Sequence, residues 1–161
     1  MDYCSWIALR AVEGIGPFLF RRLLERFETP GDVFSATPAA LCSVRGVTPH
    51  IAEAIVAPAC RHFAEAECRR IEDAGVRLLT FLDAEYPRRL FEIGDPPPLL
   101  YLRGTIPVWE PAVAVVGSRR ATREGLKAAE RLSSELAAAG VLVVSGLARG
   151  IDTAAHRGAL A

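Results

Sequence analysis

The sequence predicts an α/β protein in which a small all-helical domain, residues 1–70, precedes a doubly wound parallel sheet within residues 71–161. The first half has apolar residues at helical spacing around glycine-bearing turns. In the second half, residues 112–116 and 141–144 are continuous apolar runs, typical of strands buried on both faces of a parallel sheet. Each run leads through a glycine turn into a helical pattern, and this order implies right-handed parallel connections.

The helical half contains two copies of one unit, and the second copy follows the first at an offset of 32 residues, the distance from Leu9 to Leu41. Seven positions match in register, Leu9, Val12, Gly14, Pro17, Leu19, Leu23 and Leu24 with Leu41, Val44, Gly46, Pro49, Ile51, Ile55 and Val56. Each copy reads as helix, glycine hairpin and helix, and such a unit must pack on its partner to bury its apolar face. A further helix follows Pro58 and is expected to end at Gly75.

This repeat resembles the tandem helix-hairpin-helix family, also called SAM-like. In that family the hairpin presents backbone N–H groups to a DNA phosphate, helped by the helix N-terminus. The resemblance makes Gly14 and Gly16 candidate DNA contacts. The second hairpin, Gly46-Val47-Thr48, lacks a second glycine, so the pattern does not extend phosphate contact to it. A role in packing or protein docking, without DNA, stays open for this half.

Two short apolar segments, residues 76–82 and 99–102, have the composition of strands. The loop between them ends in three consecutive prolines, which exclude a helix interior or a central strand. A doubly wound sheet needs more than two strands, so we expect both segments to join it. The chain stops at Ala161 in or just after a helix. We therefore expect an incomplete sheet, in a fragment or a truncated product.

The turns after the two long apolar runs carry the candidate site. They read G-S-R-R-A-T at residues 117–122 and S-G-L-A-R-G-I-D at residues 145–152, and we expect Thr122 and either Asp152 or Thr153 to cap the helices that follow. Open α/β sheets bind ligands at the carboxyl ends of their strands, and helix N-termini there attract anions. Five basic residues, at positions 119, 120, 123, 127 and 131, accompany acids at 124 and 130. The pattern predicts a phosphate site formed by Gly117, Ser118, Arg119, Ser145, Gly146 and Arg149.

The sequence contains no G-x-G-x-x-G for a dinucleotide and no G-x-x-x-x-G-K-[ST] for a nucleoside triphosphate, so we expect no cofactor. The 19 basic and 19 acidic residues balance, so any nucleic-acid binding must be local. An alternative is that Gly117 and Gly146 only permit tight turns and that the arginines beside them are solvated.

The four cysteines, Cys4, Cys42, Cys60 and Cys68, form no C-x-x-C pair and have no histidine at zinc-ligand spacing. We expect buried, reduced thiols and no metal site. No run of about 18 apolar residues could form a transmembrane helix, and the N-terminus lacks the pattern of a signal peptide. A cytoplasmic protein without membrane contact is therefore expected.

The stretches AVAVVGSRRATREG and VVSGLARGIDTAAHRGAL resemble the DprA/Smf family of DNA-processing proteins, whose turns read V-G-S-R and S-G-L-A-x-G-I-D-x-x-A-H. EYPRRLFEIGDPPPLLYLRG is similar to that family's Y-P…L…P…L-Y…G segment. The resemblance implies a Rossmann-like domain that binds single-stranded DNA, protects incoming strands and helps load RecA-type recombinase during natural transformation, without enzyme activity. It also implies that a homodimer would need the family's C-terminal part, which is missing here.

Other functions remain open from the residues. Ser145, Asp152 and His156 suggest a hydrolase triad, although Ser145 lies in no G-x-S-x-G elbow. A Rossmann-type nucleotide hydrolase, similar to phosphoribohydrolases, could use the same anion turns for a nucleotide phosphate. A pure protein-docking module is the third class.

Overall fold

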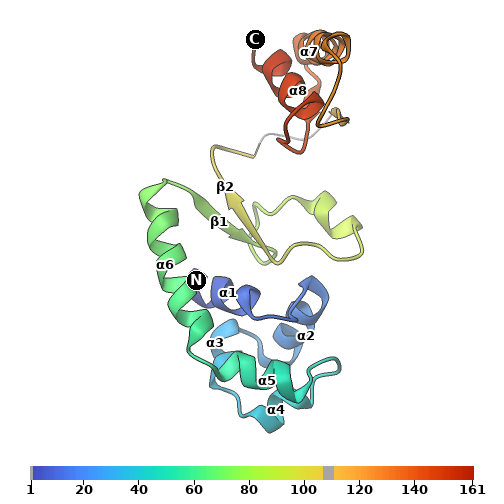
Figure 1. Ribbon diagram of the computed structural model, residues 1–161. Coiled ribbons are helices and arrows are strands. Elements are labelled where there is room, and N and C mark those ends of the chain that lie inside the picture. The colour runs from blue at the N-terminus through green and yellow to red at the C-terminus, as the bar shows by residue number, and fades with distance from the viewer. Residues whose placement is uncertain (1, 107–110) are drawn as a thin grey trace. The chain divides into compact units, whose positions relative to one another are not determined.

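The computed structural model describes residues 2–106 and 111–161, and the chain divides into two compact units, 1–106 and 107–161 (Figure 1). We call these the first and the second unit. A domain boundary is expected from the sequence near residue 70, where helical patterns end. The first unit extends past that point because the segment after α6 packs on the helices, as described below.

The first unit begins with helices whose starts are defined by caps and prolines. The helices are α1 (Tyr3–Ala11), α2 (Pro17–Phe27), α3 (Pro30–Ser35), α4 (Pro38–Cys42), α5 (Pro49–Val56) and α6 (Ala59–Asp73). Proline opens four of them, where its missing N–H has no cost. Threonine side chains cap α3, α4 and α5 by accepting a hydrogen bond from a first-turn amide.

The predicted repeat is confirmed in three dimensions. Gly14 and Gly46 both have positive φ angles, +87° and +103°, in the hairpins that precede α2 and α5. Most of the matched apolar residues form one core, in which Leu9, Leu23, Leu41 and Ile55 are fully buried. Val56 is the exception among them, at 41% exposure. The two copies therefore bury their apolar faces against each other, as a repeat of this kind must.

An aromatic cluster joins the next segment to this core. Phe81 packs edge-on against Trp6 and Phe20, with ring centroids 5.4 and 6.5 Å apart. Phe81 directly follows β1 (Arg77–Thr80), which pairs antiparallel with β2 (Leu99–Leu102). A short 3₁₀ helix, η1 (Arg88–Glu92), lies in the loop between the strands. These contacts explain why the first unit continues beyond its last helix.

The strands predicted at residues 76–82 and 99–102 therefore exist, but they do not join the parallel sheet. Each pairs with the other in a separate two-stranded sheet. The expectation that they would extend the parallel sheet was wrong, because the ring of Phe81 anchors β1 to the helical core.

The second unit has the predicted strand–helix–strand–helix order: β3 (Ala112–Ala114), α7 (Arg123–Ala138), β4 (Leu142–Val144) and α8 (Ile151–Leu160). β3 and β4 are parallel, with Ala112 opposite Leu142. The two helices pack closely, since a Cβ at Gly158 would lie 1.9 Å from the Glu130 carbonyl oxygen. The predicted α/β class, a helical region followed by a parallel sheet with helices, is confirmed.

The strands of this sheet are less buried than predicted. Val113 is 40% exposed and Val116, just beyond β3, is 72% exposed, while Leu142–Val144 are half-buried. Two strands offer each other few neighbours, and α7 and α8 pack mainly against each other and only slightly against the sheet. The prediction of strands covered on both faces was therefore wrong for the described residues.

The prediction of four buried thiols was also wrong. α1 packs against α6 and brings the Cα atoms of Cys4 and Cys68 to 6.1 Å, within disulfide range, and the two residues form a disulfide. Of the other two cysteines, Cys42 is exposed and Cys60 is half-buried, and both are free. Among the helices of the described residues, none is long and apolar enough to cross a membrane.

Candidate nucleic-acid interface

The two predicted anion turns of the second unit lie against each other. The Ile151 amide, at the start of α8, donates a hydrogen bond of 3.2 Å to the Ser118 carbonyl in the first turn. A Cβ at Gly150 would lie 2.2 Å from that same carbonyl oxygen, and a Cβ at Gly117 would lie 2.7 Å from the Ile151 side chain. Glycine is required at both positions by close approach. The structure thus brings residues some 30 positions apart in the chain into one surface.

The first turn is shaped by its own side chains. The Ser118 hydroxyl oxygen accepts a hydrogen bond of 3.0 Å from the Arg120 amide, a local turn that serine favours. Thr122 caps α7, as predicted, by accepting from the Gly125 amide at 3.1 Å. Gly117, Ser118 and Arg119 are exposed. The turn therefore presents its backbone and the Arg119 side chain to solvent beside a helix N-terminus, where an anion is favoured.

The second turn uses Ser145 for the fold. The Ser145 hydroxyl donates a hydrogen bond of 2.6 Å to the Val115 carbonyl, which ties the end of β4 to the end of β3. Its proton is therefore committed within the protein. Ser145 positions this turn, and any contact with a phosphate would come from the neighbouring backbone.

An acid restricts where an anion can sit on this turn. The Asp152 carboxylate is only 7% exposed, and its Oδ2 lies 2.9 Å from the position that a Gly146 Cβ would occupy. A negative charge so close to Gly146 repels a phosphate placed there. The favourable part of the surface is therefore the Gly117–Arg119 turn together with Arg149, whose side chain is exposed.

The cap predicted for α8 was wrong. The N-cap residue is Gly150, with φ +89° and no side-chain hydrogen bond, while Asp152 lies in the first turn. Thr153 instead donates from its hydroxyl to the Ala148 carbonyl at 2.7 Å, which closes the loop before the helix. Glycine occupies the cap because the close approach of Ser118 leaves no room for a side chain there.

Leu147 is a surface feature of the second turn that the sequence pattern does not predict. This residue is 80% exposed and has a positive φ of +55°, a conformation that costs a bulky residue on the order of 1 kcal/mol or more. The fold thus holds an apolar side chain outward in the middle of the second turn. The motif S-G-L-A-R-G does not indicate this strain, because the strain depends on backbone angles that only the structure shows.

Within residues 111–161, the arginines around the two turns form no ion pairs with carboxylates. Within residues 111–161, Arg119, Arg120, Arg123 and Arg149 have no carboxylate within salt-bridge distance, whereas Arg131 pairs with Glu135 at 2.7 Å. Arg131, counted in the basic cluster from the sequence, is therefore neutralised. The positive charge that remains lies in the first turn, in the first half of α7 and at Arg149.

The predicted alternative of a hydrolase triad is not assembled among the described residues. Ser145 donates to a backbone carbonyl, and the buried Nε2 of His156 has no hydrogen-bond partner. No hydrogen bond joins Ser145 or Asp152 to His156 in residues 111–161. These three side chains consequently lack the nucleophile–base contact that such catalysis requires.

The two hairpins of the first unit differ at the following helix. Thr48 caps α5, and its side-chain oxygen accepts from the Ile51 amide at 3.3 Å. Gly16 is the N-cap of α2 and provides no side-chain cap, and its own amide donates no hydrogen bond within residues 2–106. Free amides at a helix N-terminus are the groups that bind a phosphate. This geometry favours phosphate contact at the first hairpin over the second, which agrees with the order expected from their glycines.

Both halves of the chain match known families. Residues 77–161 match the model of the family described as DNA recombination-mediator protein A, and residues 7–59 match that of the SAM-like helix-hairpin-helix tandem. The chain is 35% identical, over 99% of its length, to Protein Smf of Synechocystis, of which it spans 41%. It is 46% identical over half its length to DNA processing protein DprA of Streptococcus pneumoniae, of which the alignment covers 29%.

The structure shows the same relationship. It is similar to the X-ray structure of DNA processing protein A (DprA) from Streptococcus pneumoniae, with a TM-score of 0.70 and 29% sequence identity. That similarity covers 99% of this chain and 54% of the other. The chain therefore spans roughly half of these relatives or less. With one family model matching more than half of its residues, and with this fold, the chain belongs to the DprA/Smf family of DNA-processing proteins.

Proposed function

We propose that this chain binds single-stranded DNA, and that the turns of the second unit contact its phosphates. The observation that carries the proposal is the direct contact between the two turns, from the Ile151 amide to the Ser118 carbonyl. It brings the Arg119 backbone against Gly150, the neighbour of Arg149, and neither arginine has a carboxylate partner within residues 111–161. Guanidinium groups suit phosphate because they offer several N–H donors in a fixed plane. The exposed Leu147 adds an apolar contact for a sugar or a base.

The position of Asp152 favours a strand over a free nucleotide. A nucleotide ends in a phosphate monoester, which carries nearly two negative charges at neutral pH. A phosphodiester in a strand carries one. Repulsion from the Asp152 carboxylate beside Gly146 is therefore about twice as large for the monoester. A strand also offers several phosphates, so that Arg119 and Arg149 need not share one.

The wider role follows from the relatives and belongs to the same proposal. Proteins named DNA processing protein DprA are similar to this chain, and we propose that it takes part in DNA uptake and recombination. In this role it protects incoming single strands and helps load a RecA-type recombinase in the cytoplasm, as a binding protein without catalysis. We propose a homodimer only for a longer chain that includes the C-terminal part of the family.

The test is fluorescence-anisotropy titration of labelled oligo-dT of increasing length, with competition by thymidine monophosphate. We expect affinity to rise with oligonucleotide length and to fall with salt, with little competition by the mononucleotide. Saturation by the mononucleotide would instead favour a nucleotide-binding enzyme. Absence of binding to either would contradict the proposal and leave a docking module.

A further inference from the structure

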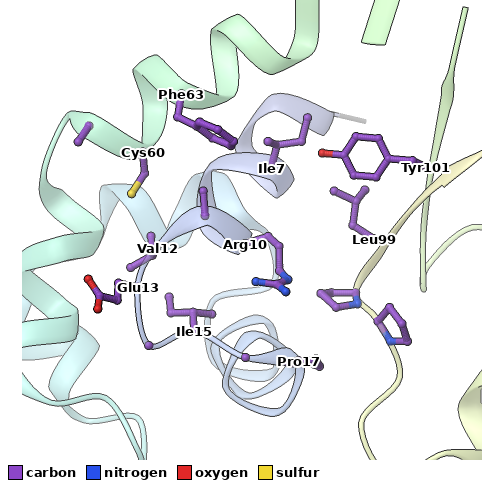
Figure 2. A pocket seen from close by; sticks show the side chains of 16 residues that line it. Ile7, Arg10, Val12, Glu13, Ile15, Pro17, Cys60, Phe63, Leu99 and Tyr101 are labelled. Carbon is purple, nitrogen blue, oxygen red and sulfur yellow. The ribbon is translucent and has the colours of Figure 1, made fainter. Parts of the chain in front are cut away.

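The first unit contains a groove of about 1150 Å³ beside its first hairpin (Figure 2). The walls are formed by α1, residues 12–17 of the hairpin, the start of α6, Pro97 and Pro98, and Leu99 and Tyr101 of β2. All lining residues belong to the first unit, so the groove is complete within it. Its volume slightly exceeds that of typical ligand sites, which measure about 300–1000 Å³.

Two aromatic rings make this groove unusual. Phe63, on α6, and Tyr101, on β2, both line it, and each is 52% exposed. Figure 2 shows Ile7 and Leu99 close to these rings, so that the rings border an apolar surface. Nucleic-acid bases stack on exposed aromatic rings regardless of sequence, because every base has a flat π-face. Paired bases in a duplex have their faces covered, so only a single strand offers this contact.

The same groove carries a cation and free amides. Arg10 lines it, is exposed, and has no acid within salt-bridge distance among residues 2–106. The uncapped N-terminus of α2 begins at Gly16, another lining residue. Glu13 also lines the groove, but its carboxylate and the Arg10 guanidinium are well separated in Figure 2. The Glu67 carboxylate lies near the Tyr101 hydroxyl, so a phosphodiester is favoured on the Arg10 and Gly16 side of the groove and not at that hydroxyl.

The wall opposite the hairpin is held in place by hydrogen bonds. The hydroxyl of Tyr86, which is 3% exposed, donates to the Pro97 carbonyl at 2.7 Å. The Phe81 amide donates to the Pro98 carbonyl at 3.3 Å, next to the aromatic cluster of the core. The groove is thus formed in advance, which reduces the entropy lost on binding.

We propose that this groove binds a short segment of single-stranded DNA, whose bases stack on Phe63 and Tyr101 while a phosphate lies near Arg10 and the Gly16 amide. The inference rests on the proposed function, because it adds a second single-strand contact to the one on the second unit. It supplies base-stacking aromatics, of which residues 111–161 contain none.

The first test is replacement of the rings in the full chain. Phe63→Leu and Tyr101→Leu keep apolar volume and remove the flat face, and each should weaken oligo-dT binding by about fivefold or more. They should also reduce the fluorescence change of an oligonucleotide that contains 2-aminopurine, which reports stacking. Tyr101→Phe keeps the ring and removes only the hydroxyl, so it should bind oligo-dT more tightly than Tyr101→Leu. Phe18→Leu is the matched control, since Phe18 is 59% exposed and does not line the groove.

The second test uses the native thiols. Cys60 lines the groove, whereas the free Cys42 is exposed on α4 outside it. Saturating oligo-dT should slow maleimide labelling of Cys60 several-fold and leave Cys42 unchanged, as measured by peptide mass spectrometry. Equal labelling of Cys60 with and without oligonucleotide would overturn the inference.

The outcomes separate this inference from the proposed function. If Arg119→Ala weakens oligo-dT binding while both leucine variants of the groove bind as the wild type does, the groove is not a DNA site and the proposed function stands. If the groove variants weaken binding and Arg119→Ala does not, the groove is a DNA site and the turns of the second unit are not. If the unaltered chain binds no oligo-dT, both are overturned.

Discussion

Replacing Gly150 with alanine would place a methyl group between the two turns of the second unit. Its Cβ would lie 2.2 Å from the Ser118 carbonyl oxygen and 2.9 Å from backbone atoms of Arg119. Ordinary C···O contacts are about 3.3–3.6 Å, so the first turn must move by about 1 Å. Gly150 also has φ +89° and ψ −128°, angles that are costly for any residue with a Cβ.

The expected loss of stability can be built from these parts. The backbone strain costs about 1–3 kcal/mol. Displacing Ser118 also weakens its hydrogen bond with the Ile151 amide, which adds about 1 kcal/mol. The free energy of unfolding should therefore fall by about 2–4 kcal/mol, measured by urea denaturation. Oligo-dT affinity should fall as well in the variant that remains folded, because Arg119 moves away from the second turn.

Gly140→Ala is the matched control within the same unit. Gly140 also has a positive φ, +75°, but nothing lies within 4 Å of its added Cβ. This variant should lose only about 1–2 kcal/mol, for the left-handed backbone, and bind DNA unchanged. If Gly150→Ala costs no more than Gly140→Ala and binds oligo-dT normally, the packed contact between the turns is not what forms the site.

Three further predictions follow from single interactions. Arg119→Ala should lower the slope of log affinity against log salt by about one, whereas Arg131→Ala should leave the slope unchanged because Arg131 is paired with Glu135. Equal slopes for the two variants would contradict the assigned site. Reduction of the Cys4–Cys68 disulfide should change the mobility of the protein on a non-reducing gel and lower its free energy of unfolding by about 2–4 kcal/mol. Identical melting temperatures with and without reductant would show that the disulfide does not stabilise the fold. Tyr86→Phe should lower the free energy of unfolding by about 1 kcal/mol, measured by urea denaturation, because it removes the hydrogen bond to the Pro97 carbonyl. Burial raises the pKa of Tyr86 above its ordinary value of 10.0, so the wild-type protein should lose stability as the pH rises through the pKa of the folded state. A urea midpoint for Tyr86→Phe equal to that of the wild type would show that this bond does not stabilise the fold.

The repeated unit shows how much of this fold can be predicted locally. Gly14 with Pro17 and Gly46 with Pro49 define two hairpins and two helix starts through backbone conformations that few other residues favour. The apolar spacing around them then determines which faces meet in the core. Strand–helix–strand–helix order in the second half likewise determines a parallel sheet, because antiparallel pairing does not need a helical crossover.

Tertiary contacts decided what local pattern could not express. The ring of Phe81 packs on Trp6 and Phe20, and this contact places β1 and β2 with the helices instead of in the parallel sheet. Cys4 and Cys68 pair because α1 lies along α6, and their sequence separation of 64 gives no indication of it.

For the candidate site, the sequence by itself determined which residues form the turns, since glycines 117 and 146 and the nearby arginines follow each strand directly. The tertiary structure decided how they act. It set Ser118 against Gly150, turned the Ser145 hydroxyl toward Val115, and brought the Asp152 carboxylate beside Gly146. Phe63 and Tyr101 lie far apart in the chain, on a helix and on a strand, and only folding places both on one groove. Local pattern determines backbone conformation, but which charges and rings share a surface depends on packing between distant segments.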